Sequence, residues 1–158
     1  MSAVDGTSRH RAREAALQML YQWEVGRVSA HEAVRTYWPG RDAPPSPEDE
    51  HADAVPDVVV DENNRTWANA LVAGTIQRVA ETDELIVKHL KNWRIERVAV
   101  IDRLVMRMAI CEMLTEPGTP AKVIINEALE LARTFSGEEP VALINGVLDA
   151  VRKTLGRD

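Results

Sequence analysis

A cluster of basic side chains near the start of the sequence is the first group of residues that could carry chemistry. The cluster comprises Arg9, His10, Arg11 and Arg13. Guanidinium groups bind phosphate through paired, charge-assisted hydrogen bonds. The apolar period that follows places the cluster at the beginning of a helix, where free backbone N–H groups also favour anions. Cations are unfavourable there and only Glu14 offsets them locally, so the cluster breaks a local rule, as functional sites often do.

Two interpretations of this cluster remain open. In the first, the cations form a solvated surface or pair with acids of the same protein, which is the usual role of a charged run. In the second, they contact nucleic acid. The net charge of −6 excludes a protein that coats nucleic acid with its whole surface. The second interpretation therefore needs a local positive patch on an acidic body, and a partner that adds contacts.

The sequence lacks the motifs of the common catalytic sites. It contains no glycine-rich phosphate loop, no G-x-S-x-G and no H-E-x-x-H. Its four histidines have no second ligand at helical spacing, so we expect no metal site and no cofactor. The single cysteine, Cys111, excludes an intramolecular disulfide and indicates a reducing compartment. These features predict a protein that is not an enzyme.

Two asparagines, Asn126 and Asn145, interrupt segments that are otherwise apolar and helical in period. Each is either a buried group that hydrogen-bonds the interior or a residue of an interface. We favour the buried alternative, because a buried amide that bonds backbone groups fixes the register of a helix.

Apolar residues recur with helical period along most of the chain, and no long segment alternates with the period of a strand. The predicted fold class is all-α. The pattern predicts about seven helices, over residues 8–26, 29–38, 64–79, 82–90, 98–114, 120–135 and 140–151.

The domain organisation follows from composition. We expect a disordered tail over residues 1–7 and one helical domain over residues 8–158. Residues 39–61 hold five of the eight prolines among many acids, which predicts an acidic, proline-rich loop insertion. The first residues, MSAVDGTSRHR, lack the apolar stretch of a signal peptide, and no run approaches the roughly 18 apolar residues of a membrane span. We therefore expect a cytoplasmic protein with no membrane partner.

Four segments resemble the NusB family of bacterial transcription antitermination factors. The resemblance runs in order along almost the whole chain and fails only in the acidic loop. In that family the fold is an all-helical domain of two small packed bundles, which agrees with the seven helices predicted above. The segments are RHRARE (9–14), LQMLYQW (17–23), KVIINEA (122–128) and INGVLD (144–149).

The resemblance implies binding rather than catalysis. Proteins of the family pair with NusE, a ribosomal protein of the small subunit, and the pair recognises single-stranded boxA RNA of ribosomal RNA operons. This helps RNA polymerase read through terminators in an antitermination complex. The alternative is a helical protein–protein adaptor or homodimer without direct RNA binding, because some members of the family self-associate and bury the RNA face.

Site residues carry over from the family one at a time. The arginine-rich start maps onto Arg9, Arg11 and Arg13, and His10 stands where the family often has another basic residue. Lys122 matches a lysine that opens the sixth helix and is expected to be a second RNA contact. Glu139 corresponds to an acid near the RNA path and is expected to accept a hydrogen bond from a base edge. Asp102 is the best-matched acid for contact with NusE.

Overall fold

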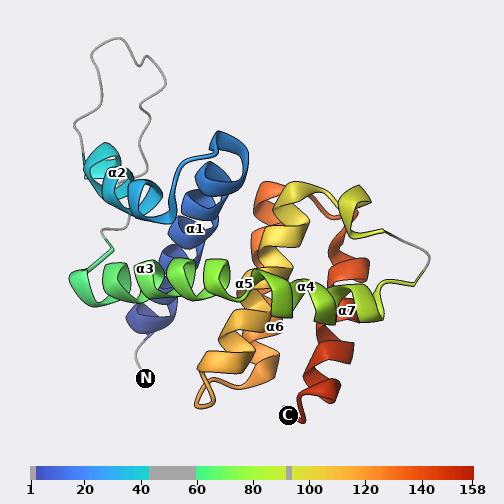
Figure 1. Cartoon of the computed structure of the whole chain (residues 1–158). Helices are drawn as coiled ribbons and strands as arrows, with labels where there is room; N and C mark the ends of the chain where they lie inside the picture. The colour runs from blue at the N-terminus through green and yellow to red at the C-terminus, as the bar shows by residue number, and fades with distance from the viewer. Residues whose placement is uncertain (1–2, 43–59, 92–93) are drawn as a thin grey trace. The chain divides into compact units, whose positions relative to one another are not determined.

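The computed structural model describes residues 3–42, 60–91 and 94–158, and every regular element in these ranges is helical (Figure 1). The all-α prediction is confirmed. No helix of the described residues is long and apolar enough to cross a membrane. A short 3-10 helix, η1 (Ile95–Arg97), accompanies the α-helices, which are α1 (Ala3–Gly26), α2 (Ala30–Asp42), α3 (Glu62–Gln77), α4 (Val79–His89), α5 (Val100–Thr115), α6 (Ala121–Phe135) and α7 (Val141–Thr154).

The chain divides into two compact units, Met1–Asn69 and Ala70–Asp158. The first unit contains α1, α2 and the beginning of α3, and the second contains the end of α3 with α4 to α7. In α1 the apolar stripe predicted from the sequence is buried, and α1 packs against α2. The stripe includes Ala12, Ala15, Ala16, Met19 and Leu20.

The first helix begins earlier than the sequence indicates. The expected tail covers residues 1–7, but α1 starts at Ala3, so that expectation is wrong for residues 3–7. Once a buried stripe has nucleated a helix, each added residue gains a hydrogen bond at little further cost. Local composition alone therefore places the helix start too late.

The second helix does not end at Pro39, where the sequence predicts its stop, but continues to Asp42. Arg65 donates hydrogen bonds of 2.9 and 2.8 Å to the Asp42 carboxylate and lies 4.7 Å from the centre of the Trp38 ring. The indole N–H of Trp38 donates to the Asn69 side chain at 2.9 Å. These contacts from α3 hold the last turn of α2 although proline lacks an N–H. Most of the predicted loop, residues 43–59, lies outside the described residues.

Local capping explains one helix start and not another. The Glu32 N–H donates to the Ser29 hydroxyl at 3.1 Å, which confirms the predicted cap of α2. The predicted cap of the fourth helix at Thr82 is wrong, because α4 begins at Val79 and only Arg78 separates it from α3. Thr82 is buried inside α4, and its hydroxyl donates to the Val79 carbonyl at 3.2 Å.

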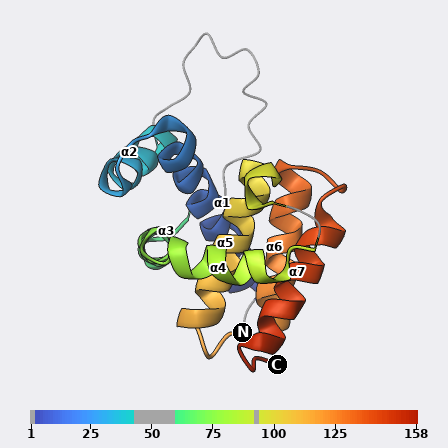
Figure 2. The ribbon, with the colours of Figure 1, turned by 45° about the vertical axis from the view of Figure 1, so that its right-hand side comes forward.

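The core of the second unit is built around α5. Every residue from 104 to 113 is buried, which is typical of a helix surrounded by neighbours. It contacts α4, α6 and α7, and α4 runs across α5 and α7 (Figures 1 and 2). In α6 and α7 the residues at i, i+3 and i+4 spacing are buried as the sequence predicts, among them Ile124, Leu131, Ile144 and Leu148.

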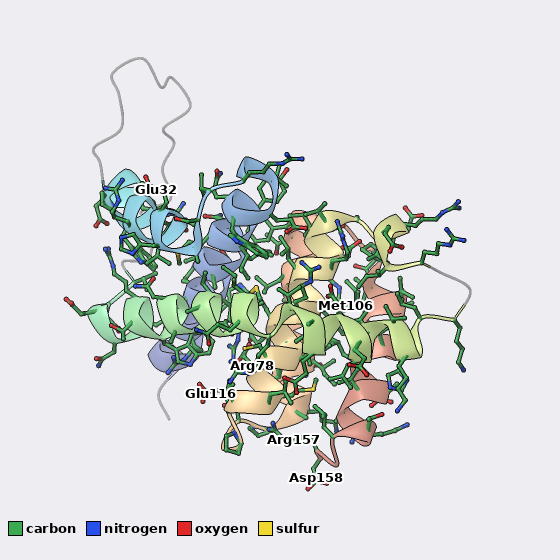
Figure 3. All side chains as sticks on the ribbon, in the orientation of Figure 1. Glu32, Arg78, Met106, Glu116, Arg157 and Asp158 are labelled. Carbon is green, nitrogen blue, oxygen red and sulfur yellow. The ribbon has the colours of Figure 1, made fainter. Side chains whose placement is uncertain are left out.

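Charged side chains brace the edges of this core. The Arg107 guanidinium donates to both oxygens of Asp83 at 2.7 and 2.9 Å, which links α5 to α4. Near the end of the chain, Arg157 donates to the carbonyl oxygen of Met113 in the last turn of α5 and to that of Glu116 just beyond it (Figure 3). The first interaction links two helices and the second fixes the end of α5.

Candidate nucleic-acid interface

The basic cluster lies inside α1 and not at its start. Because α1 begins at Ala3, Arg9 is six residues into the helix. The first four N–H groups, which are the ones a helix leaves unpaired, belong to earlier residues. The expectation that helix N–H groups would share in anion binding is therefore wrong, and the chemistry of the cluster depends on its side chains.

Two arginines of the cluster stack against one tryptophan. The guanidinium carbons of Arg9 and Arg13 lie 4.3 and 5.1 Å from the centre of the Trp67 ring on α3. Guanidinium groups are attracted to the face of an indole ring, with a gain of about 0.5–2 kcal/mol that grows as water is excluded. Arg13 is only 5% exposed, so it is an interior group, and the structure does not present it to a ligand. Arg9 is half-buried, with its guanidinium held by the ring.

The other two members of the cluster share one acid. The His10 Nε2 atom lies 2.8 Å from a Glu14 carboxylate oxygen, and the Arg11 guanidinium lies 3.1 Å from the same oxygen. The side chains of His10 and Arg11 are 28% and 41% exposed. Glu14 thus offsets part of the positive charge of this segment. We call Arg9, His10, Arg11 and Arg13 the basic face of α1, and Arg11 is its more exposed member of the pair that shares Glu14.

Lys122 and Glu139 belong to the second unit. Lys122 is exposed on the first turn of α6, and Glu139 is exposed immediately before Pro140, the residue that precedes α7. Lys122 lines a pocket of about 700 Å³ together with Asn126 and Asn145, whereas Glu139 does not line it. Lys122 therefore lines the same pocket as two asparagines that the sequence analysis expected to be buried.

The prediction that Asn126 and Asn145 are buried is wrong, since both side chains are exposed. Each directly follows a buried isoleucine, Ile125 or Ile144. One residue along a helix turns the side chain by about 100°, which carries each amide away from the core. The helical phase of the sequence contained this signal.

Asp102 is not a surface acid. It is 6% exposed, and its buried Oδ1 atom has no hydrogen-bond partner among the described residues. Burial raises the pKa of Asp102 above its ordinary value, and the Ser136 hydrogen bond offsets this only in part. A direct contact between Asp102 and a protein partner does not fit this placement.

A more accessible surface of the second unit lies near η1. Val87, which is 52% exposed, lines a pocket of about 530 Å³ with Arg94, Ile95, Glu96 and Arg97. In residues 3–42, 60–91 and 94–158, no three metal-ligating side chains come together.

This helical fold, with preordered cations on one face, defines a protein suited to an anionic polymer. The model of the NusB family matches residues 10–153. The transcription antitermination protein NusB of Solibacter usitatus is 42% identical over 148 residues, which cover 94% of this chain and 90% of that protein. The chain belongs to the NusB family.

Solved structures share the fold. The structure of T. maritima NusB has a TM-score of 0.75 and 27% sequence identity, and the match covers 92% of this chain and 90% of that one. A structure of the antitermination factors NusB and NusE in complex with double-stranded RNA also has a TM-score of 0.75. At 20% identity it covers 94% of this chain and 98% of that chain, and it shows the fold alone.

Proposed function

We propose that this chain is an RNA-binding transcription antitermination factor and not an enzyme. It acts in the cytoplasm with NusE on single-stranded boxA RNA of ribosomal RNA operons, within an antitermination complex of RNA polymerase. The observation that carries the proposal is the basic face of α1, where Trp67 holds Arg9 while Arg11 and His10 remain accessible. Membership of the NusB family supports it.

The basic face acts by neutralising phosphate. Arg11 contacts a phosphate of a single strand through charge-assisted hydrogen bonds. Arg9 lies two residues earlier, about 200° around the helix, so it contacts a different part of the strand. The Trp67 ring under Arg9 lowers the entropy lost when its guanidinium is fixed. The acidic body of the protein, with a net charge of −6, opposes RNA contact wherever basic side chains are absent. Aromatic residues make up only 4% of the chain, so base stacking contributes little. Affinity for RNA therefore depends on the contacts that NusE adds.

The surface around η1 is the proposed contact for NusE. It combines the exposed apolar side chain of Val87 with Ile95 and a rim of Arg94, Glu96 and Arg97. An apolar centre with a charged rim is typical of a protein interface. Asp102, which the sequence analysis selected for this role, lies buried and is replaced in the proposal by this surface.

Arginine substitution in a matched pair tests the RNA-binding proposal. Arg11 and Arg35 are both exposed, and each pairs with a glutamate at i,i+3 spacing, so Arg11→Ala and Arg35→Ala remove equivalent charges from the same unit. We expect Arg11→Ala to weaken boxA binding by about five- to tenfold in the presence of NusE, as the loss of one charge-assisted contact would. The log–log salt slope should fall by about 0.7, the value for one phosphate of a single strand.

Arg35→Ala should leave both quantities unchanged. If the wild-type protein binds no RNA with NusE present at any salt concentration, the proposal fails. A helical adaptor or homodimer without RNA binding then takes its place.

A further inference from the structure

A pocket lined by residues of α6 and α7 lies in the second unit. Its volume of about 700 Å³ falls within the roughly 300–1,000 Å³ of pockets that hold small ligands. Asp158, labelled in Figure 3, is one of its lining residues. The lining residues that matter for the argument are Lys122, Ile125 and Asn126 from α6 and Asn145, Asp149 and Arg152 from α7.

Two of the four charged side chains of this pocket pair with each other. Arg152 donates to Asp149 through two nitrogens at 3.0 and 2.8 Å and to the Arg157 carbonyl through the third at 3.0 Å. Hydrogen bonds from Arg152 and Lys153 lower the pKa of Asp149, so its charge is already balanced. Within the described part of the chain, Lys122 has no acidic partner and Asp158 has no basic partner. The pocket therefore offers one cation, Lys122, and one acid, Asp158, to a ligand.

Two amides complete the lining. Asn126 and Asn145 are exposed, and neither side chain has a hydrogen-bond partner among the described residues. Asparagine is a poor helix former, and the usual compensation is a local hydrogen bond, which is missing at both positions. Each amide offers two donors and one acceptor. Two solvent-facing amides beside Lys122 present groups of the kind that read a base edge next to a phosphate.

We propose that this pocket binds one unstacked adenine of the RNA, with Asn126 and Asn145 on the base edges and Lys122 on the adjoining phosphate. The inference rests on the proposed function and adds a position at which sequence is read. An amide bonds adenine at N6 and N7 in a bidentate manner, and Ile125 supplies an apolar wall for the ring.

Alanine substitution at the two asparagines tests the inference without harming the fold, because alanine is the better helix former. Asn63, which is exposed on α3, gives the matched control Asn63→Ala. We expect Asn126→Ala and Asn145→Ala each to weaken binding of boxA RNA by about 5- to 100-fold, as the loss of one bidentate base contact would. Asn63→Ala should bind like wild type. Lys122→Gln should lower affinity for all RNA sequences and reduce the salt slope by about 0.7.

Altered bases locate the contact. Adenosines of the RNA are replaced one at a time by 7-deazaadenosine, which lacks the N7 acceptor. At one position the replacement should weaken binding to wild type and to Asn63→Ala, yet have no further effect on an asparagine variant. If the asparagine variants bind RNA like wild type while Arg11→Ala is impaired, the pocket inference is wrong and the proposed function stands. If they impair NusE binding alone, the pocket is a protein contact and the inference is also wrong. If wild type binds no RNA, both fail.

Discussion

Replacing Trp67 should lower both the free energy of unfolding and the affinity for RNA, because two arginines stack on its ring. Arg9 lies 4.3 Å from the ring centre and is half-buried, which corresponds to about 0.5–1 kcal/mol. Arg13 lies 5.1 Å away and is 5% exposed, so its contact is worth up to about 2 kcal/mol. Trp67→Leu should therefore lower the free energy of unfolding by roughly 1.5–3 kcal/mol from these contacts alone. For a chain of this size that is a fall in Tm of about 3–12 °C.

Thermal unfolding and RNA titration together measure the effect. Trp67→Phe keeps a weaker aromatic face and should fall between wild type and Trp67→Leu. Trp23→Leu on α1 is the matched control, since no stacked cation accompanies Trp23 in the described structure. Trp67→Leu should also weaken RNA binding by about two- to tenfold, because Arg9 must then be ordered on binding. If Trp67→Leu, Trp67→Phe and Trp23→Leu unfold at the same temperature and bind RNA equally, the stacked-cation reasoning is wrong.

Two further predictions concern stability. Gly146 lies exposed within α7, and a Cβ there would meet no atom within 4 Å. Gly146→Ala should therefore raise the free energy of unfolding by about 0.5–1 kcal/mol, measured by thermal or urea unfolding. A loss of stability would contradict the absence of a steric clash at this position. Burial raises the pKa of Asp102 above its ordinary value of 3.8, so the folded state holds this proton more tightly than the unfolded state. Wild-type stability from this group is greatest below pH 3.8 and is lost as pH rises through the raised pKa. Asp102→Asn should gain stability relative to wild type over that interval and then keep a constant advantage, whereas a difference independent of pH would contradict the assignment.

Local periodicity was enough to predict the helices of the second unit. The spacing of the apolar residues in α5, α6 and α7 identifies the face of each helix that is buried, and Ile124 and Ile144 are buried as expected. Boundaries set by distant contacts were not predictable in this way. Helix α2 passes Pro39 because Arg65 pairs with Asp42, a contact between residues far apart in the sequence.

The sequence identified the residues of the candidate site better than it predicted which of them are exposed. The composition identified the cations of α1, but which of them faces solvent depends on Trp67, on another helix. No local pattern could show that Arg13 is buried while Arg11 is exposed. The orientation of Asn126 was available from helical phase, because it directly follows the buried Ile125. The preference for a buried amide overrode that signal.

Residue-level mapping of RNA on the protein is the most direct test of the proposed function. Amide and arginine Nε–H resonances of the isotope-labelled chain are followed by NMR as boxA RNA is added in the presence of unlabelled NusE. The account predicts that the shifts induced by RNA centre on residues 9–14 of α1, with the Arg11 Nε–H among the most affected and Arg35 unaffected. RNA-induced shifts that leave residues 9–14 unchanged would contradict the central claim that this face binds RNA.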